Sequence, residues 1–162
     1  MAKFTLSKTL HHPLEDVFAV ASDFPNAAGA IQAITKMEML TEGEVGVGTR
    51  FRETRVMFGR EATEEMEVTR FDPPRSYELF CESHGCRYVT TMAFSPEGDG
   101  TKIEMDFEAT PLTFMAKVMS VVMKPMLNSC LKETAKDLDD IGRVLDEQIA
   151  GGSQQAETAS AG

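Results

Sequence analysis

Apolar and polar residues alternate along much of the first two thirds of the chain. In Lys102–Ala109, four apolar residues alternate with four charged ones, and Lys3–Leu10 shows the same period of two. This is the period of a half-buried β-strand. Five further segments of similar length are expected to form strands: Ile34–Thr41, Thr49–Phe58, Ala62–Phe71, Tyr77–Ser83 and Arg87–Phe94.

Short turn sequences separate these segments. Gly59-Arg60 and His84-Gly85 each lie between two of them, and Asp72-Pro73-Pro74-Arg75 is a strong strand breaker because neither proline can donate to a sheet. Strands at hairpin spacing form an antiparallel sheet with one apolar face. We therefore expect a seven-stranded antiparallel sheet.

Helical periodicity occurs after the first strand and again near the end of the chain. Pro13 precedes an apolar face formed by residues 14, 17, 18 and 21, and Ala27–Ile31 suggests a second short helix. The segment Leu112–Gln148 predicts a long helix that covers the sheet. Pro125 predicts a kink or break within it, because the proline ring clashes with the preceding turn.

The two halves on either side of Pro125 differ in pattern. The second carries a regular apolar stripe, and we expect it to anchor the helix: Leu127, Leu131, Leu138, Ile141 and Leu145. The first is apolar on nearly every side and has methionines at helical spacing, at positions 115, 119, 123 and 126. Methionine adapts to irregular shapes, so this half is either a loosely packed core helix or the lid of a cavity.

Composition is that of one globular domain. The chain has 162 residues, 42% hydrophobic and 26% charged. We expect a domain over residues 1–148 and a disordered tail over 149–162, where apolar periodicity stops. The net charge of -10 argues against a nucleic-acid partner and against simple electrostatic docking to anionic lipid.

Other features bear on location and cofactors. Without a long uncharged apolar run we expect no integral membrane segment, and 112–131 is interpreted as a core helix. The chain does not open with a signal-peptide pattern, so a cytoplasmic protein is expected. The cysteines (Cys81, Cys86 and Cys130) lack metal-ligand spacing and are expected to be reduced, although a bridge between the first two is possible. We expect no metal and no cofactor.

Several turn motifs in this order resemble the START-like superfamily (SRPBCC, also called Bet v 1-like), and most of all its polyketide cyclase/dehydrase branch. They are Pro13-Leu-Glu-Asp-Val-Phe, Ser22-Asp23-Phe24-Pro25, Gly46-Val-Gly-Thr-Arg-Phe, Asp72-Pro-Pro-Arg and Gly98-Asp-Gly-Thr-Lys-Ile. The resemblance covers about residues 3 to 148. It implies an α+β helix-grip fold, in which a curved seven-stranded sheet wraps on a long C-terminal helix, with two short helices after the first strand. The chain departs from the branch at Phe51, where tryptophan is common.

The resemblance also implies a cavity between the sheet and the C-terminal helix. Residues expected to line it are Phe51, Glu64, Met66, Tyr77, Leu79, Tyr88, Met92, Met105, Phe107, Met115, Met119 and Met123. Strand 49–58 carries charge on both faces, so its register stays open, and an inward Glu64 could pair with Arg52 or Arg55. Each tyrosine hydroxyl would be satisfied by backbone or would bind a ligand.

Three functions are compatible with this pattern. The first is binding or transport of a hydrophobic or amphipathic small molecule, such as a lipid, isoprenoid or polyketide. The second is a cyclase or dehydratase that uses polar groups in the same cavity, which would require Glu64 and an arginine to converge with Tyr77 or Tyr88. The third is a protein-interaction module. Of these, binding without catalysis is favoured. The protein is expected to be a monomer or a weak homodimer.

Overall fold

A computed structural model describes residues 2–160 of the chain, with side chains to residue 151. Seven antiparallel strands form one sheet in the order β1-β7-β6-β5-β4-β3-β2. Their bounds are β1 Ala2–Leu10, β2 Ile34–Met39, β3 Arg50–Met57, β4 Arg60–Asp72, β5 Ser76–Ser83, β6 Cys86–Glu97 and β7 Gly100–Pro111. All seven strands predicted from the alternation are therefore confirmed.

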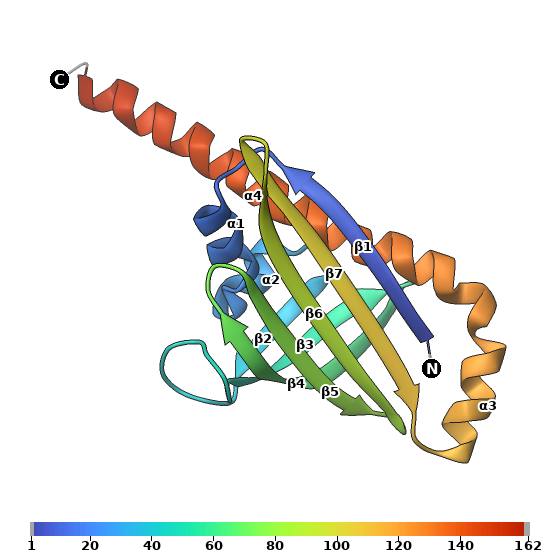
Figure 1. Ribbon diagram of the computed structural model, residues 1–162. Coiled ribbons are helices and arrows are strands. Elements are labelled where there is room, and N and C mark those ends of the chain that lie inside the picture. The colour runs from blue at the N-terminus through green and yellow to red at the C-terminus, as the bar shows by residue number, and fades with distance from the viewer. Residues whose placement is uncertain (1, 161–162) are drawn as a thin grey trace.

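The helices follow the predicted order. They are α1 Leu14–Ala21, the 3-10 turn η1 Phe24–Asn26, α2 Ala27–Ala30, α3 Phe114–Val122, the 3-10 turn η2 Lys124–Met126 and α4 Leu127–Ser160. The sheet curves around α4, with α1 and α2 on the same side, whereas α3 lies beyond the end of the sheet (Figure 1). This arrangement is the expected α+β helix-grip fold.

Pro125 breaks the last helical segment, as its sequence predicted. It lies in η2, where three residues change from α-helical to 3-10 geometry between α3 and α4. The chain changes direction at this point (Figure 1). The proline has no N–H to donate, and its ring would clash with the backbone carbonyl one helical turn earlier. A continuous α-helix is therefore prevented.

Helix α4 corresponds to the second of the two predicted halves, and part of its predicted apolar stripe anchors it in the core. Leu138, Ile141 and Leu145 are each at most 5% exposed and belong to the core with Phe18, Tyr77 and others. Leu127 and Leu131 are only half-buried. Helix α4 is described to Ser160, beyond the expected boundary at residue 148, and the division into domain and tail stays a prediction.

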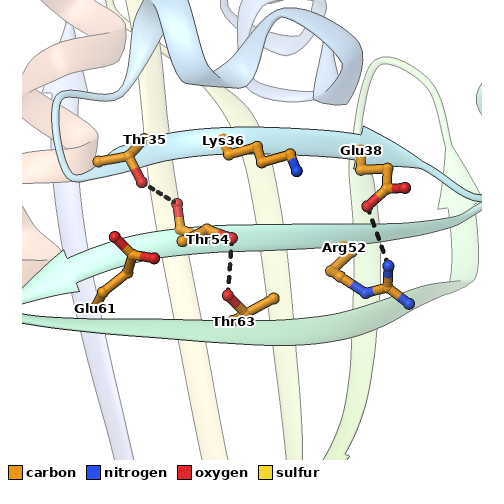
Figure 2. A pocket seen from close by; sticks show the side chains of 7 residues that line it. All are labelled: Thr35, Lys36, Glu38, Arg52, Thr54, Glu61 and Thr63. Atoms are coloured by element: carbon orange, nitrogen blue, oxygen red, sulfur yellow. Dashed lines mark hydrogen bonds and ion pairs between the residues drawn. The ribbon is translucent and has the colours of Figure 1, made fainter.

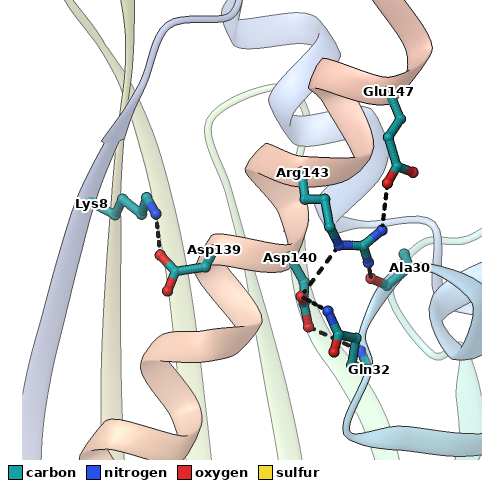
Figure 3. A network of polar contacts seen from close by, with 7 residues as sticks. All are labelled: Lys8, Ala30, Gln32, Asp139, Asp140, Arg143 and Glu147. Carbon is teal, nitrogen blue, oxygen red and sulfur yellow. Dashed lines mark hydrogen bonds and ion pairs between the residues drawn. The ribbon is translucent and has the colours of Figure 1, made fainter. Parts of the chain in front are cut away.

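Polar contacts fix α4 on both sides of its apolar stripe. The Asp140 carboxylate accepts hydrogen bonds from the Gln32 backbone N–H at 2.9 Å and from Gln32 Nε2 at 3.1 Å. Arg143 donates to the Ala30 carbonyl at 2.9 Å, and Lys8 pairs with Asp139 (Figure 3). The end of α2, the loop before β2 and the strand β1 are thereby joined to the middle of α4.

Helix α3 has a different environment. Ala116 is its only buried residue, and Phe114, Val121 and Val122 are each more than 60% exposed. The interpretation of residues 112–131 as a core helix is therefore wrong for α3. The helix begins at its N-cap Thr113, whose hydroxyl accepts from Ala116 N at 3.1 Å, and the preceding Leu112 N–H donates to the Gly85 carbonyl at 2.8 Å.

The β5–β6 turn packs directly on that cap. A Cβ placed on Gly85 would lie 2.7 Å from Thr113 Oγ1, and the glycine has a φ of +74°. Both facts require glycine here, because any side chain would clash and would be strained. The β3–β4 turn, the β5–β6 turn and the end of β7 share one end of the antiparallel sheet, which we call the α3 end.

Candidate functional site

The aromatic residues inside the sheet form two separate groups. The larger group fills the space under α1 and η1, with ring centroids of Phe24 and Phe51 at 4.8 Å and of Phe18 and Phe94 at 5.3 Å. Tyr77 joins it, and its hydroxyl donates to the Ala21 carbonyl at 3.1 Å. This group is hydrophobic core, and the Tyr77 hydroxyl is satisfied by backbone.

The second group lies nearer the α3 end and is less packed. Phe4 on β1, Phe107 on β7 and Tyr88 on β6 form a row across three neighbouring strands, which we call the aromatic row. The Phe4 and Phe107 rings stack with centroids 4.8 Å apart, and the Phe107 and Tyr88 centroids are 5.9 Å apart. All three are only half-buried. They form an apolar wall that side chains of the protein do not cover completely.

Polar groups border this wall at its Tyr88 side. Cys81 pairs with Tyr88 across β5 and β6, and its Sγ lies 3.8 Å from Glu64 Oε2. Burial, with a contribution from Glu64, raises the pKa of the Cys81 thiol to about 11. Burial is the main cause that raises the pKa of Tyr88 to about 12, and the neighbouring Cys86 and Glu64 add to this shift. At neutral pH the border therefore offers a phenol and a thiol as donors beside a carboxylate acceptor.

A buried ion cluster lies farther along the same face. Arg55 donates to Glu53 Oε1 at 2.6 Å and to Asp137 Oδ2 of α4 at 3.0 Å. Burial disfavours the charge on Arg55, but the two carboxylates outweigh this and raise its pKa. Burial also raises the pKa of Asp137, although Arg55 opposes that shift. Asp137 Oδ1 is buried without a hydrogen-bond partner in the described part of the chain.

The structure shows which face of β3 is inward, a point that the sequence left open. Phe51, Glu53 and Arg55 face inward, and Arg52 faces outward, where it pairs with Glu38 at 3.0 Å. Arg55 is committed to Glu53 and Asp137. The suggested pair of Glu64 with Arg52 or Arg55 is therefore not formed. Instead, Oε1 of Glu64 lies 3.8 Å from Nδ1 of His84.

The residues expected to line a cavity fall into three groups. Phe51, Tyr77 and Met92 are buried in the core. Glu64, Met66, Leu79, Tyr88, Met105 and Phe107 are half-buried on the concave face. Met115, Met119 and Met123 are 67%, 50% and 44% exposed on or beside α3. Contact of any of them with a ligand stays a prediction.

Three relevant residues were missed by the sequence analysis as site residues. Phe4 could have been found from its place in the alternation of β1, and Cys81 from its position opposite Tyr88 in the predicted hairpin. Asp137 gave no local signal, because one aspartate on a charged helix is usually solvent-exposed.

Two surface hollows lie away from the concave face. One, of about 430 Å³, is on the outer face of β2, β3 and β4 and is lined mainly by polar residues such as Thr35, Arg52 and Thr63 (Figure 2). The other, of about 560 Å³, lies between β1 and α4. The three cysteines are free, and the described residues contain no cluster of His, Cys, Asp and Glu able to hold a metal.

Comparison with known proteins gives a family and a fold. Residues 1–139 match the family described as polyketide cyclase / dehydrase and lipid transport. No curated protein matches the chain. No helix among the described residues is both long and apolar enough to cross a membrane.

Several solved structures share the fold at low sequence identity. Ara h 8.0201 superposes with a TM-score of 0.64 at 17% identity, over 90% of this chain and 98% of the other. TTHA0849 from Thermus thermophilus gives 0.68 at 19%, over 94% and 99%. The di-domain ARO/CYC StfQ from the steffimycin biosynthetic pathway gives 0.72 at 12%, over 91% of this chain and 51% of that one. The chain is thus similar to about half of StfQ.

Proposed function

Because the chain belongs to the polyketide cyclase / dehydrase and lipid transport family, we propose that it binds a hydrophobic or amphipathic small molecule on the concave face of its sheet, at the α3 end. The observation that supports this most is the aromatic row. Phe4, Phe107 and Tyr88 are held by the sheet yet remain half-buried. Apolar surface left open on a rigid scaffold is what a ligand pocket requires.

The polar border favours a ligand with a hydroxyl or another neutral polar group. Arg55 is already neutralised by Glu53 and Asp137, and Glu64 brings a further negative charge to the border. A carboxylate head group would be repelled there, whereas a hydroxyl could donate to Glu64 and accept from the Tyr88 phenol. A lipid, isoprenoid or polyketide with free hydroxyls fits these groups.

Two matched substitutions test the aromatic row. Phe107→Ala removes the central ring of the row, and Phe80→Ala removes a half-buried ring of β5 that lies under the guanidinium of Arg87. Displacement of a fluorescent apolar probe, together with native mass spectrometry of the purified protein after lipid extraction, reports binding. We expect the first substitution to weaken probe binding about tenfold or more, because an aromatic contact surface is lost. Phe80→Ala should have little effect.

Equal weakening by both variants, or no retained apolar molecule and no probe binding in the unmodified protein, would contradict the proposal. Tyr88→Phe provides a second control on the polar border. It should reduce affinity for a hydroxylated ligand more than for its unhydroxylated analogue, because only the former loses a hydrogen bond.

A cyclase or dehydratase remains the second candidate, supported by the convergence of Glu64, Cys81 and Tyr88 on one border. Two of the groups considered for it are occupied: Arg55 by its carboxylates and the Tyr77 hydroxyl by the Ala21 carbonyl. Glu64 would be the acid or base. Glu64→Gln should then abolish turnover of a polyketide substrate while probe binding persists.

A further inference from the structure

We propose that α3 is a membrane-docking element, which rests the α3 end of the protein on the surface of an anionic lipid bilayer. The exposed apolar side chains of this segment are concentrated within a dozen consecutive residues. They are Leu112, Phe114, Met115, Val118, Met119, Val121, Val122 and Met123, each at least 43% exposed. An exposed apolar patch of this kind marks a surface that another body covers.

The charge of the segment around α3 indicates that an anionic bilayer covers this surface. Residues 109–132 contain Lys117, Lys124 and Lys132 and no acidic residue, in a chain whose net charge is -10. The acidity of the whole chain argued against docking to anionic lipid, but the structure places Lys117 on α3, which lies beyond the end of the sheet (Figure 1), and Lys124 directly after it in η2. Lys132 follows near the start of α4. Lysines beside a bilayer surface are attracted to anionic head groups, while apolar side chains enter the acyl boundary.

A second copy of the chain fits this surface less well. In a two-fold dimer the same patch would meet itself, so Lys117 and Lys124 would approach their own equivalents with no acidic residue of this segment to compensate. The length of α3 is also informative. Nine residues reach only about 14 Å, too short to span a bilayer, so the helix would lie on the surface.

The β3–β4 turn adds an apolar residue at the same end of the sheet. Phe58 is 50% exposed and has a φ of 52°, a left-handed conformation that is unusual for a bulky residue. The proposal does not depend on ligand binding. It would, however, place the aromatic row near the membrane from which an apolar ligand comes.

The chain contains no tryptophan, which allows single reporters to be introduced. Val122→Trp places the reporter on α3, and Val47→Trp places it in the loop between β2 and β3, at the opposite end of β3; the two valines are 63% and 70% exposed. Each protein is mixed with vesicles of phosphatidylcholine alone or with added phosphatidylglycerol, some of them brominated in the acyl chains. We expect a blue shift and quenching for Val122→Trp only, and stronger with phosphatidylglycerol.

Loss-of-binding variants complete the test by vesicle flotation. Val121→Asp combined with Val122→Asp should lower the fraction bound about tenfold or more, and Val47→Asp should leave it unchanged. Lys117→Gln combined with Lys124→Gln should remove the preference for phosphatidylglycerol. The proposal is overturned if the unmodified protein does not float with either vesicle, or if both Trp reporters respond equally. It is also overturned if light scattering shows a dimer that Val121→Asp with Val122→Asp dissociates.

Discussion

At the scale of the residue, Arg55 of β3 pairs with Glu53 on its own strand and with Asp137 of α4, so the contact with Asp137 joins the two elements. The side chains of Arg55, Glu53 and Asp137 are 22%, 9% and 17% exposed. Arg55→Met would leave both carboxylates buried without their cation. We expect the free energy of unfolding to fall by about 3–5 kcal/mol, measured by urea denaturation. Arg52→Met is the matched control on the outer face, where the side chains of Arg52 and Glu38 are 43% and 47% exposed and loss of the pair should cost at most about 1 kcal/mol.

Cys81 gives a prediction for alkaline pH. Its thiol is neutral in the folded protein, with a pKa raised from 9.0 to about 11. A raised pKa of an acid means that the contribution to stability is complete below pH 9 and is lost as pH rises through about 11. The urea midpoint should therefore decline over this range, and less steeply in Cys81→Ala. Parallel declines in both proteins would show that Cys81 does not contribute.

At the scale of the element, α3 and α4 share one apolar segment but differ in what they stabilise. Ile141 of α4 is 5% exposed and Val121 of α3 is 62% exposed. Ile141→Ala should lower the free energy of unfolding by about 2–5 kcal/mol, because a cavity forms in the core. Val121→Ala should change it by less than about 0.5 kcal/mol. Similar losses in the two variants would mean that α3 packs in solution.

Elements were easier to predict than the site, for a physical reason. Alternation and turn chemistry act within a few residues, and they identified every strand and the break at Pro125. The inward charge of β3 was not predicted, because Arg55 pairs with Asp137, which is distant in the sequence, and an inward charge cannot be recognised until its partner is placed. Exposure of α3 was not predicted for a related reason: an apolar segment has the same sequence pattern whether it packs in a core or lies on the surface.

At the scale of the whole molecule, Leu145 is the last buried residue among the described side chains. Ile149 is already 59% exposed. Deletion of residues 151–162 should therefore leave the urea midpoint and the binding of an apolar probe unchanged, in agreement with a domain that ends near residue 148. A lower midpoint after deletion would assign the distal part of α4 to the folded domain.

The break at Pro125 also has a consequence for evolution. Because α4 contributes residues to the core cluster and α3 contributes none, substitutions in α3 can accumulate at little thermodynamic cost, and selection can adjust that helix to new partners without rebuilding the scaffold. The three solved structures compared above are only 12–19% identical to this chain. A proline that divides one apolar segment into a constrained part and a permissive part is one route by which a single architecture can diversify while remaining foldable.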